Sequence, residues 1–181
     1  MALMQNGSVW ATGWNEFGQL GDGSKTDRTN YVQVIFCGAW SVAAGSQHSI
    51  VLKQDGSVWT AGSNQFGQLG IGSPYDRQSF VQVISGRGSV VAAGAYYSMV
   101  IKQDDTLWAS GMNEDSQFGD GSTTSHHKFI KVDPFGNGTG HGRIMIMQMH
   151  FAFIFVLVCD CLLQCTHQLA MRETSRRHSS L

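Results

Sequence analysis

The chain contains very little proline, and its charged residues form no long run of one sign. Only 2 of its 181 residues are proline, against 22 glycines. This balance is typical of many tight turns between short strands and excludes a proline-rich linker. The formal net charge is −1, with neither a basic stripe nor an acidic tail. Composition therefore does not support nucleic-acid binding, and no nucleic-acid partner is expected.

The sequence also lacks a secretory leader, a disulfide framework and a helical periodicity. Residues 1–6 have neither a charged start nor an apolar stretch, so they do not resemble a signal peptide. Of the four cysteines only Cys37 precedes residue 159, which favours a reduced, intracellular setting, cytoplasmic or nuclear. No 3.6-residue spacing of apolar residues runs through residues 1–132, so amphipathic helices are not predicted there.

What the sequence does contain is one motif that occurs three times at a constant spacing of 49 residues. The segment Asn-x-Phe-Gly-Gln-Leu-Gly at residues 15–21 returns at residues 64–70 and, altered, at residues 113–119. A period of this length indicates units too small to bury an apolar face alone, so that each unit packs against its neighbours. The units begin near residues 1, 50 and 99, and the third is incomplete.

Each unit contains four short segments rich in valine, isoleucine and aromatic residues, with turn residues at both ends. One set comprises residues 42–45, 49–53, 57–61 and 80–84. The second and third segments meet at Asp55-Gly56, a dipeptide typical of a tight hairpin whose two central residues take positive φ. The third copy has Asp104-Asp105 there, and this turn is expected to be weaker or differently shaped because Asp adopts that conformation less readily than Gly. The pattern predicts an all-β fold, a partial β-propeller of four-stranded antiparallel blades.

The repeat resembles that of the regulator of chromosome condensation family. The shared pattern is Gly-x-Val-Trp-x-x-Gly-x-Asn-x-x-Gly-Gln-Leu-Gly, then a Val-rich strand and Val-Ala-Ala-Gly-x-x-His-Ser. In this sequence it is carried by Gly7, Val9, Trp10, Gly13, Asn15, Gly18 to Gly21, Val34, Val42 to Gly45, His48 and Ser49. The resemblance covers residues 1–132, about two and a half repeats, and implies a β-propeller that closes with seven four-stranded blades.

One copy of this chain is too short to close such a ring. We therefore expect an open sector whose unpaired sheet edges favour self-association. Shifted by 49 residues, Met1 overlays Ile50, a strand position in the middle of a repeat. This register leads us to expect an N-terminally truncated piece of a longer propeller.

The function expected from the sequence is a non-enzymatic scaffold for protein–protein interaction, with an unknown protein partner. The resemblance implies an alternative, guanine-nucleotide exchange on a Ran-like small GTPase, although that activity requires a nearly complete ring face. Loops at residues 22–30, 71–79 and 120–128 differ in sequence on a repeated frame, as the recognition loops of a propeller do. The candidate partner-binding residues in these loops are Arg28, Tyr75, Arg77 and His127.

No catalytic, cofactor or metal site is predicted. The glycine-rich string at residues 18–23 lacks the following helix that a phosphate loop needs and recurs in the second unit, so structural turns explain it better. His48 and Ser49 are neighbours on a strand and point to opposite faces, which leaves His48 a structural role, hydrogen-bonded within its blade. Three aspartates lack the spacing and the glutamate of a calcium loop and fit Asx turns better: Asp22, Asp27 and Asp120.

Residues 133–181 form a divergent tail that does not follow the repeat, and three interpretations of it stay open. Its apolar segment, residues 144–163, is long enough for a transmembrane helix and a membrane-anchored propeller, but polar residues inside the segment count against this: Gln148, His150 and Asp160. A zinc site would lack the common two-residue spacing of its ligands, Cys159, Cys161, Cys165 and His167. The third interpretation is translated non-coding or frame-shifted sequence. The end of the chain, residues 168–181, is predicted to be disordered.

Overall fold

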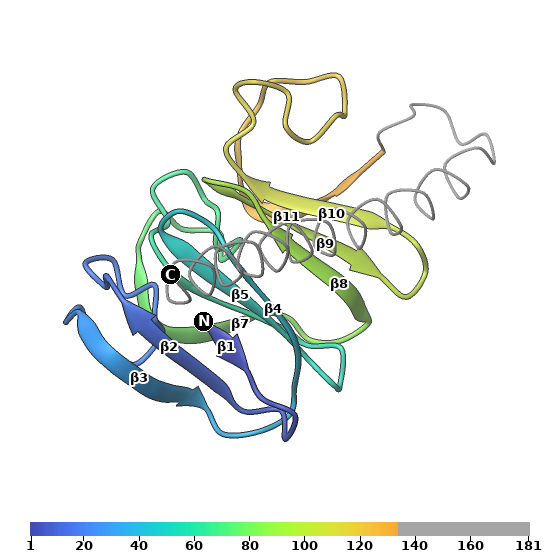
Figure 1. Cartoon of the computed structure of the whole chain (residues 1–181). Helices are drawn as coiled ribbons and strands as arrows, with labels where there is room; N and C mark the ends of the chain where they lie inside the picture. Colours follow the sequence, from blue (N-terminus) through green and yellow to red (C-terminus); the bar gives the residue numbers. More distant parts are fainter. Residues whose placement is uncertain (134–181) are drawn as a thin grey trace, which may run out of the picture. The chain divides into compact units, whose positions relative to one another are not determined.

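The computed structural model describes residues 1–133, which consist of β-strands, turns and loops. Three antiparallel sheets follow one another along the chain (Figure 1), which confirms the prediction of an all-β propeller sector. Sheet 1 has the strand order β1-β2-β3, sheet 2 has β4-β5-β6-β7 and sheet 3 has β8-β9-β10-β11. The strands are β1 (Ala2–Leu3), β2 (Val9–Gly13), β3 (Arg28–Ile35), β4 (Ala39–Ala44), β5 (His48–Lys53), β6 (Val58–Gly62), β7 (Arg77–Ile84), β8 (Gly88–Ala93), β9 (Tyr97–Lys102), β10 (Leu107–Gly111) and β11 (His126–Val132).

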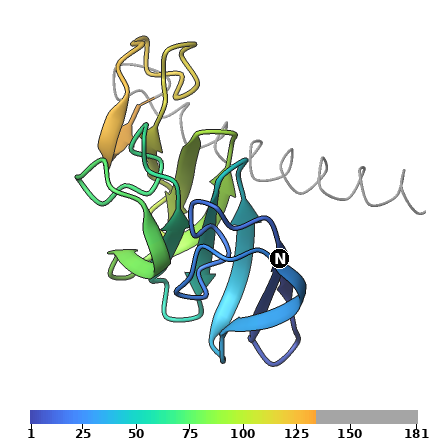
Figure 2. The same ribbon diagram turned by 90° about the vertical axis from the view of Figure 1, so that its left-hand side faces the viewer.

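Consecutive sheets lie side by side, as Figures 1 and 2 show from two directions. Their first strands contact each other, with β4 against both β1 and β8. The links between sheets, residues 36–38 and 85–87, are out of phase with the repeat units that begin near residues 1, 50 and 99. A blade therefore takes its first strand from the end of one sequence unit and its remaining strands from the next.

The three hairpins that join β1 to β2, β5 to β6 and β9 to β10 have the same geometry. Positive φ occurs at the second residue of each pair, 76° at Gly7, 77° at Gly56 and 60° at Asp105, and not at both residues as expected. The prediction of a differently shaped third turn is also wrong, because Asp105 N donates to Lys102 O at 3.0 Å just as Gly56 N donates to Lys53 O at 3.0 Å. That this turn is weaker stays a prediction. One left-handed residue after the turn is typical of a three-residue hairpin loop.

A short chain of side-chain hydrogen bonds explains why the third hairpin keeps this shape. Asp104 Oδ1 accepts from Thr106 N and Oγ1 at 3.2 and 2.6 Å, and Thr106 Oγ1 accepts from Trp108 Nε1 at 2.9 Å. The second hairpin has the same arrangement through Asp55, Ser57 and Trp59. These bonds hold the turn independently of the residue that follows the first aspartate.

The apolar core lies between the sheets. Strand β5 buries Ile50 and Leu52 on one face and Val51 on the other, as the alternation of a strand requires. The cluster between sheets 1 and 2 contains Val9, Ile35, Ala39 and Val51. The cluster between sheets 2 and 3 contains Ile50, Leu52, Val58, Val91 and Val100. Sheet 2 is therefore covered on both faces, in keeping with units that bury their apolar faces only against neighbours.

The interpretations of the tail concern residues outside the described part of the chain. This applies to the apolar segment 144–163, to the zinc site considered for Cys159, Cys161, Cys165 and His167, and to the disorder predicted for residues 168–181. Among residues 1–133 no helix has the length and apolar character needed to cross a membrane.

Candidate functional site

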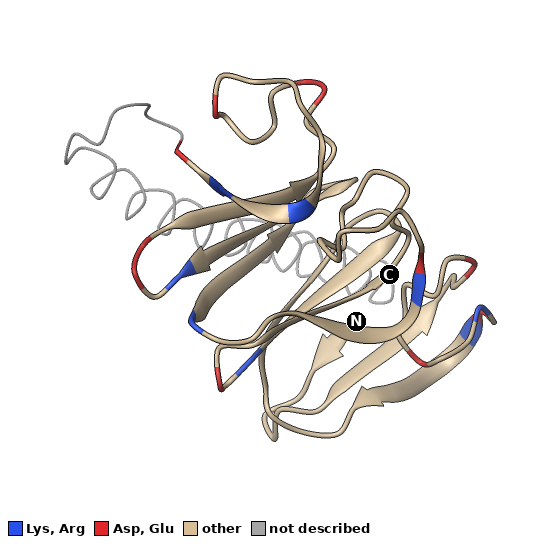
Figure 3. Cartoon of the chain, turned by 180° about the vertical axis from the view of Figure 1, so that it is seen from behind, with Lys and Arg blue, Asp and Glu red and all other residues tan. Residues whose placement is uncertain are grey.

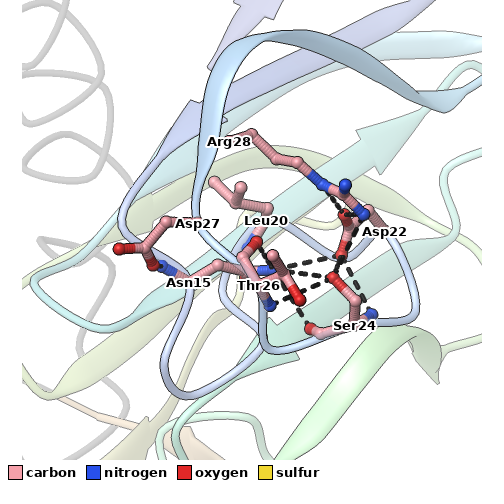
Figure 4. Close-up of polar contacts among 7 residues, drawn as sticks. All are labelled: Asn15, Leu20, Asp22, Ser24, Thr26, Asp27 and Arg28. Carbon is pink, nitrogen blue, oxygen red and sulfur yellow. Dashed lines mark hydrogen bonds and ion pairs between the residues drawn. The ribbon is translucent and has the colours of Figure 1, made fainter.

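Strands β2, β6 and β10 are each followed by a long loop that is organised around one buried asparagine. We call residues 14–27, 63–76 and 112–125 loops 1, 2 and 3. In loop 1, Asn15 is fully buried, its Oδ1 accepts from Leu20 N at 2.9 Å, and its Nδ2 donates to Thr26 O at 3.1 Å (Figure 4). The later loops repeat the first of these bonds, between Asn64 and Leu69 and between Asn113 and Phe118. The asparagine of the repeat motif therefore shapes the loop and does not face a ligand.

An ion pair braces loop 1 further. Arg28 Nη2 lies 2.6 Å from Asp22 Oδ2, and Asp22 Oδ1 accepts from Ser24 N at 3.0 Å (Figure 4). Burial raises the pKa of Asp22, but the hydrogen bonds from Arg28 and Ser24 outweigh it and hold this pKa below its ordinary value. Arg28, a predicted partner-binding residue, is thus engaged in its own loop.

Loop 1 packs onto β7, the last strand of sheet 2, and we call this contact joint 1. A Cβ on Gly18 would lie 2.5 Å from Gln78 Cα, and one on Gly21 would lie 2.3 Å from the Phe80 ring. Gly23 N donates to Gln78 O at 2.9 Å. The glycine-rich string is required here because a neighbouring strand occupies the space of the missing side chains.

Loop 2 packs onto β11 of sheet 3 in the same way, forming joint 2. A Cβ on Gly67 would lie 2.5 Å from His127 Cα, and one on Gly70 would lie 2.3 Å from the Phe129 ring. Gly72 N donates to His127 O at 2.7 Å. The glycines therefore act as structural spacers between sheets, which agrees with the expectation of structural turns.

Serine hydroxyls fasten each loop to the second strand of the next sheet. Ser49 Oγ donates to Gln19 O at 2.7 Å across joint 1, and Ser98 Oγ donates to Gln68 O at 2.7 Å across joint 2. All four residues belong to the repeated motif, so the Gly-Gln-Leu-Gly and His-Ser segments of the pattern meet in space. The conserved spacing of the motif within this chain therefore reflects residues that form the contact between two neighbouring blades.

His48 also bonds across joint 2, and not within its own blade as expected. Its Nε2 lies 2.9 Å from Ser98 Oγ, which has already given its only proton to Gln68 O, so Nε2 is the donor. The ring lies against Gly45, and Nδ1 is buried without a hydrogen-bond partner among residues 1–133. Burial lowers the pKa of His48 to about 4. His48 and Ser49 have separate partners, so they form no nucleophile–base pair.

Two equivalent grooves open beside the joints. Groove 1 has a volume of about 590 Å³ and groove 2 of about 390 Å³. Each residue lining groove 2 has a counterpart 49 residues earlier in groove 1. In both grooves a lysine lies over a tryptophan, with Lys53 Nζ 4.1 Å from the Trp59 ring centroid and Lys102 Nζ 3.6 Å from that of Trp108.

Large apolar side chains are exposed around the first link between sheets. We call Met4, Phe36 and Trp40 the first-link patch; their exposed fractions are 51%, 78% and 66%. The segments that carry them are joined by a hydrogen bond from Ala39 N to Gly7 O at 3.0 Å. The counterparts of the patch around the second link are Lys53, Ser85 and Ser89. The exposed apolar side chains therefore occur at the first link and not at the second, so the repeat itself does not require them.

Sequence reasoning did not identify the first-link patch. The available signal was a comparison of the two links, Phe36 to Trp40 against Ser85 to Ser89, in which aromatic residues are replaced by serine. The predicted recognition residues were placed in the loops, where propellers often carry them, and not at this end of the sheets.

The four predicted partner-binding residues come from three different sheets. Arg28 begins β3, Arg77 begins β7, and His127 lies on β11. Arg77 Nη1 donates to Asp76 O at 3.1 Å, while Tyr75 is 71% exposed on loop 2. Partner binding by these residues stays a prediction.

Within residues 1–133 no group of three or more His, Cys, Asp and Glu side chains is arranged to hold a metal ion. Asp22 and Asp120 form the Asx turns expected of them, with Ser24 N and Ser122 N as donors at 3.0 and 2.9 Å. Asp27 differs, because its Oδ1 accepts from the more distant Asn15 N at 2.8 Å.

Comparison with solved structures finds the same fold in proteins of low sequence identity. Prp20p from Saccharomyces cerevisiae matches with a TM-score of 0.67 and 21% identity over 75% of this chain and 36% of Prp20p. The structure of Kap60 bound to yeast Prp20 gives 0.63 and 20% over 75% and 35%, and human WBSCR16 gives 0.62 and 22% over 74% and 36%. The chain thus spans about a third of the length of these proteins. A comparison with curated proteins found no match.

Comparison with family models matches the repeat itself. The model of the regulator of chromosome condensation (RCC1) repeat matches residues 6–52 and 55–101, and a second model of the same repeat matches residues 41–68. These ranges contain Asn15 and Asn64, and with them the glycines and bridging serines of both joints. The chain belongs to the regulator of chromosome condensation (RCC1) repeat family.

Proposed function

We propose that this chain is a non-enzymatic interaction module that binds another protein through the first-link patch. The observation that supports it is the exposure of Phe36 and Trp40, 78% and 66%, at positions where the second link has Ser85 and Ser89. Since the second link folds with serines, the aromatic residues are not needed for the repeat frame. Exposed aromatic side chains are typical anchors of protein interfaces.

Relatives of the same fold make a protein partner reasonable. The structure of Prp20p was described together with its binding properties to Gsp1p and histones, and another structure holds Prp20 bound to Kap60. Those partners belong to Prp20, of which this chain matches about a third. They support the class of partner proposed here and not its identity.

The proposal is tested by replacing the patch with the residues of the second link. The double variant Phe36→Ser/Trp40→Ser and the control Tyr75→Ser, which removes a different exposed aromatic side chain, are immobilised as full chains beside the unaltered protein. Proteins captured from an extract of the source cells are quantified by mass spectrometry. We expect a partner retained by the unaltered chain and Tyr75→Ser but reduced about tenfold or more by the double variant.

Two results would contradict the proposal. If all three chains capture the same proteins equally, the patch carries no binding function. If Tyr75→Ser alone loses the partner, binding belongs to loop 2, as the sequence predicted. Circular dichroism of each variant verifies that the sheets are intact.

A further inference from the structure

Groove 2 combines apolar walls with a local concentration of positive charge. It is lined by Gly70, Val83, Ile84, Ser85, Lys102, Trp108, Lys128 and Phe129. Among these described lining residues none is acidic. Charged residues lie mainly at turns and strand ends (Figure 3), and Lys102 at the end of β9 and Lys128 near the start of β11 both line this groove.

Packing holds both lysines beside the groove. Lys102 Nζ lies 3.6 Å from the Trp108 ring centroid. The alkyl chain of Lys128 lies against Gly72, with its Cε 2.4 Å from the place that a Cβ on this glycine would occupy. A third lysine, Lys131, stands opposite Trp108 in the strand register. The carboxylate nearest to Lys102 in sequence, Asp104, accepts hydrogen bonds from Thr106, and these bonds together with the charge of Lys102 lower its pKa.

Groove 1 provides a comparison inside the same molecule. Ser79 stands in place of Lys128, and Gln82 in place of Lys131. Asp22 lines groove 1 and forms an ion pair with Arg28. The two grooves share the lysine over tryptophan, but they differ in net charge and in one wall residue, which is Phe36 in groove 1 and Ser85 in groove 2.

We propose that groove 2 binds an acidic segment of a partner protein, with carboxylates at Lys102 and Lys128 and a neighbouring aromatic side chain against Trp108 and Phe129. Carboxylates complement the lysines through charge-assisted hydrogen bonds, and an aromatic ring packs favourably against the exposed edges of aromatic walls. The volume of about 390 Å³ accommodates one such side chain with its flanking residues. The inference deepens the proposed protein-binding function and adds a second contact surface, separate from the first-link patch.

The two tryptophan indoles allow both grooves to be observed in one titration. Trp108 Nε1 donates to Thr106 Oγ1 and Trp59 Nε1 donates to Ser57 Oγ, each at 2.9 Å, so the two indole N–H signals report equivalent positions. The full chain, labelled with ¹⁵N, is titrated with acetyl-Glu-Phe-Glu-amide and with acetyl-Gln-Phe-Gln-amide. We expect a saturable shift of the Trp108 signal with the Glu peptide, binding at least about 5-fold weaker with the Gln peptide, and a smaller response of Trp59.

Substitutions taken from other repeats of the same chain identify the lysines. Lys128→Ser copies Ser79, and Lys102→Met copies Met4, so each new residue is already found at the equivalent place. We expect each to raise the dissociation constant about 5-fold and to reduce its dependence on salt. Lys53→Met is the matched control, because it removes the same charge from groove 1 and should leave binding at Trp108 unchanged.

The proposal is overturned if no saturable shift occurs, if the Gln peptide binds as well as the Glu peptide, or if Lys53→Met weakens binding as much as Lys102→Met. A shift of Trp108 by inorganic phosphate alone at the same affinity would indicate a simple anion site and would also overturn it. Binding is read at Trp108 in groove 2, whose described lining contains no residue of the first-link patch. Failure here therefore leaves the patch proposal standing, and loss of the patch proposal leaves the peptide result unaffected.

Discussion

The same glycine-containing turn occurs in two different surroundings. In loops 1 and 2 a neighbouring sheet packs on the turn, whereas within residues 1–133 no sheet packs on loop 3. Gly18 and Gly67 are buried beneath a neighbouring strand, whereas their counterpart Ser116 is exposed. Ser116 nevertheless has a φ of 59°, close to the 79° of Gly18 and the 83° of Gly67. The turn itself accepts a residue with a side chain, so it is the approach of the next sheet that demands glycine.

The aromatic position on the last strand of each sheet shows the same dependence on a neighbour. Phe80 and Phe129 pack on Gly21 and Gly70 and are partly buried, while their counterpart Tyr31 on sheet 1 is 57% exposed. A further sheet could not seat on loop 3 in the geometry of the joints without a shift, because a Cβ is already present at Ser116. Self-association through this end would need a different geometry from joints 1 and 2.

The largest effect is expected from a side chain introduced at a joint. Gly67→Ala places a Cβ about where His127 Cα approaches to 2.5 Å, at a φ of 83°. Overpacking against backbone together with left-handed strain should lower the free energy of unfolding by about 4 kcal/mol. Urea unfolding followed by tryptophan fluorescence measures the change.

The control is the same substitution in loop 3. Gly119 has a φ of 69°, and no atom of the described part of the chain lies within 4 Å of the place that a Cβ on this glycine would occupy. Gly119→Ala should therefore cost only about 1 kcal/mol for the backbone strain. Equal losses for the two variants would show that turn conformation, and not the neighbouring sheet, sets the requirement for glycine.

A somewhat smaller effect is expected from pH at joint 2. The pKa of His48 is about 4 in the folded chain against an ordinary 6.5, because burial disfavours the charged ring. Above pH 6.5 the histidine is neutral in both states. As the pH falls from 6.5 towards 4, the unfolded chain takes up a proton that the folded chain does not. Stability should therefore fall by about 3 kcal/mol across this window.

The contribution of His48 is isolated by His48→Gln, whose amide can still donate to Ser98 Oγ. Urea unfolding of both chains is measured at pH 7, 6 and 5. The unaltered chain should lose about 1.4 kcal/mol per pH unit more than the variant between pH 6 and 5. Parallel pH profiles would mean that His48 titrates normally in the folded chain.

The repeat made the blades predictable, but not their contacts. Alternating apolar residues in each segment specify strands, and the 49-residue period specifies neighbours, so the sheets follow from local sequence. The partner of His48 is Ser98, in the next sheet, which no spacing within one unit reveals. The shape predicted for the Asp104-Asp105 turn was wrong because side-chain bonds to Thr106 and Trp108 outweigh the preference of one residue.

The candidate sites depended even more on tertiary structure. The first-link patch could be recognised only from the solvent exposure of Phe36 and Trp40. Groove 2 could be recognised only from the fold, which places Lys102 of β9 and Lys128 of β11 along the same groove. Residues from separate strands converge through sheet packing, which a motif does not describe. In contrast, Arg28, which was predicted to bind a partner, forms an ion pair with Asp22 that stabilises loop 1.

The smallest effect on the free energy of unfolding is expected in loop 3. There Ser116→Gly introduces the glycine that loops 1 and 2 have at the equivalent position. The substitution removes a Cβ held at a φ of 59°, which costs about 1 kcal/mol or more, but it also gives the unfolded chain more freedom. The net gain in unfolding free energy should be about 0.5 kcal/mol, seen as a higher urea midpoint at constant slope. Ser116→Ala keeps the Cβ and should gain nothing. If Ser116→Ala stabilised the chain as much as Ser116→Gly, the hydroxyl and not the left-handed backbone would be the source of the strain, and the contrast between covered and uncovered loops would need another cause.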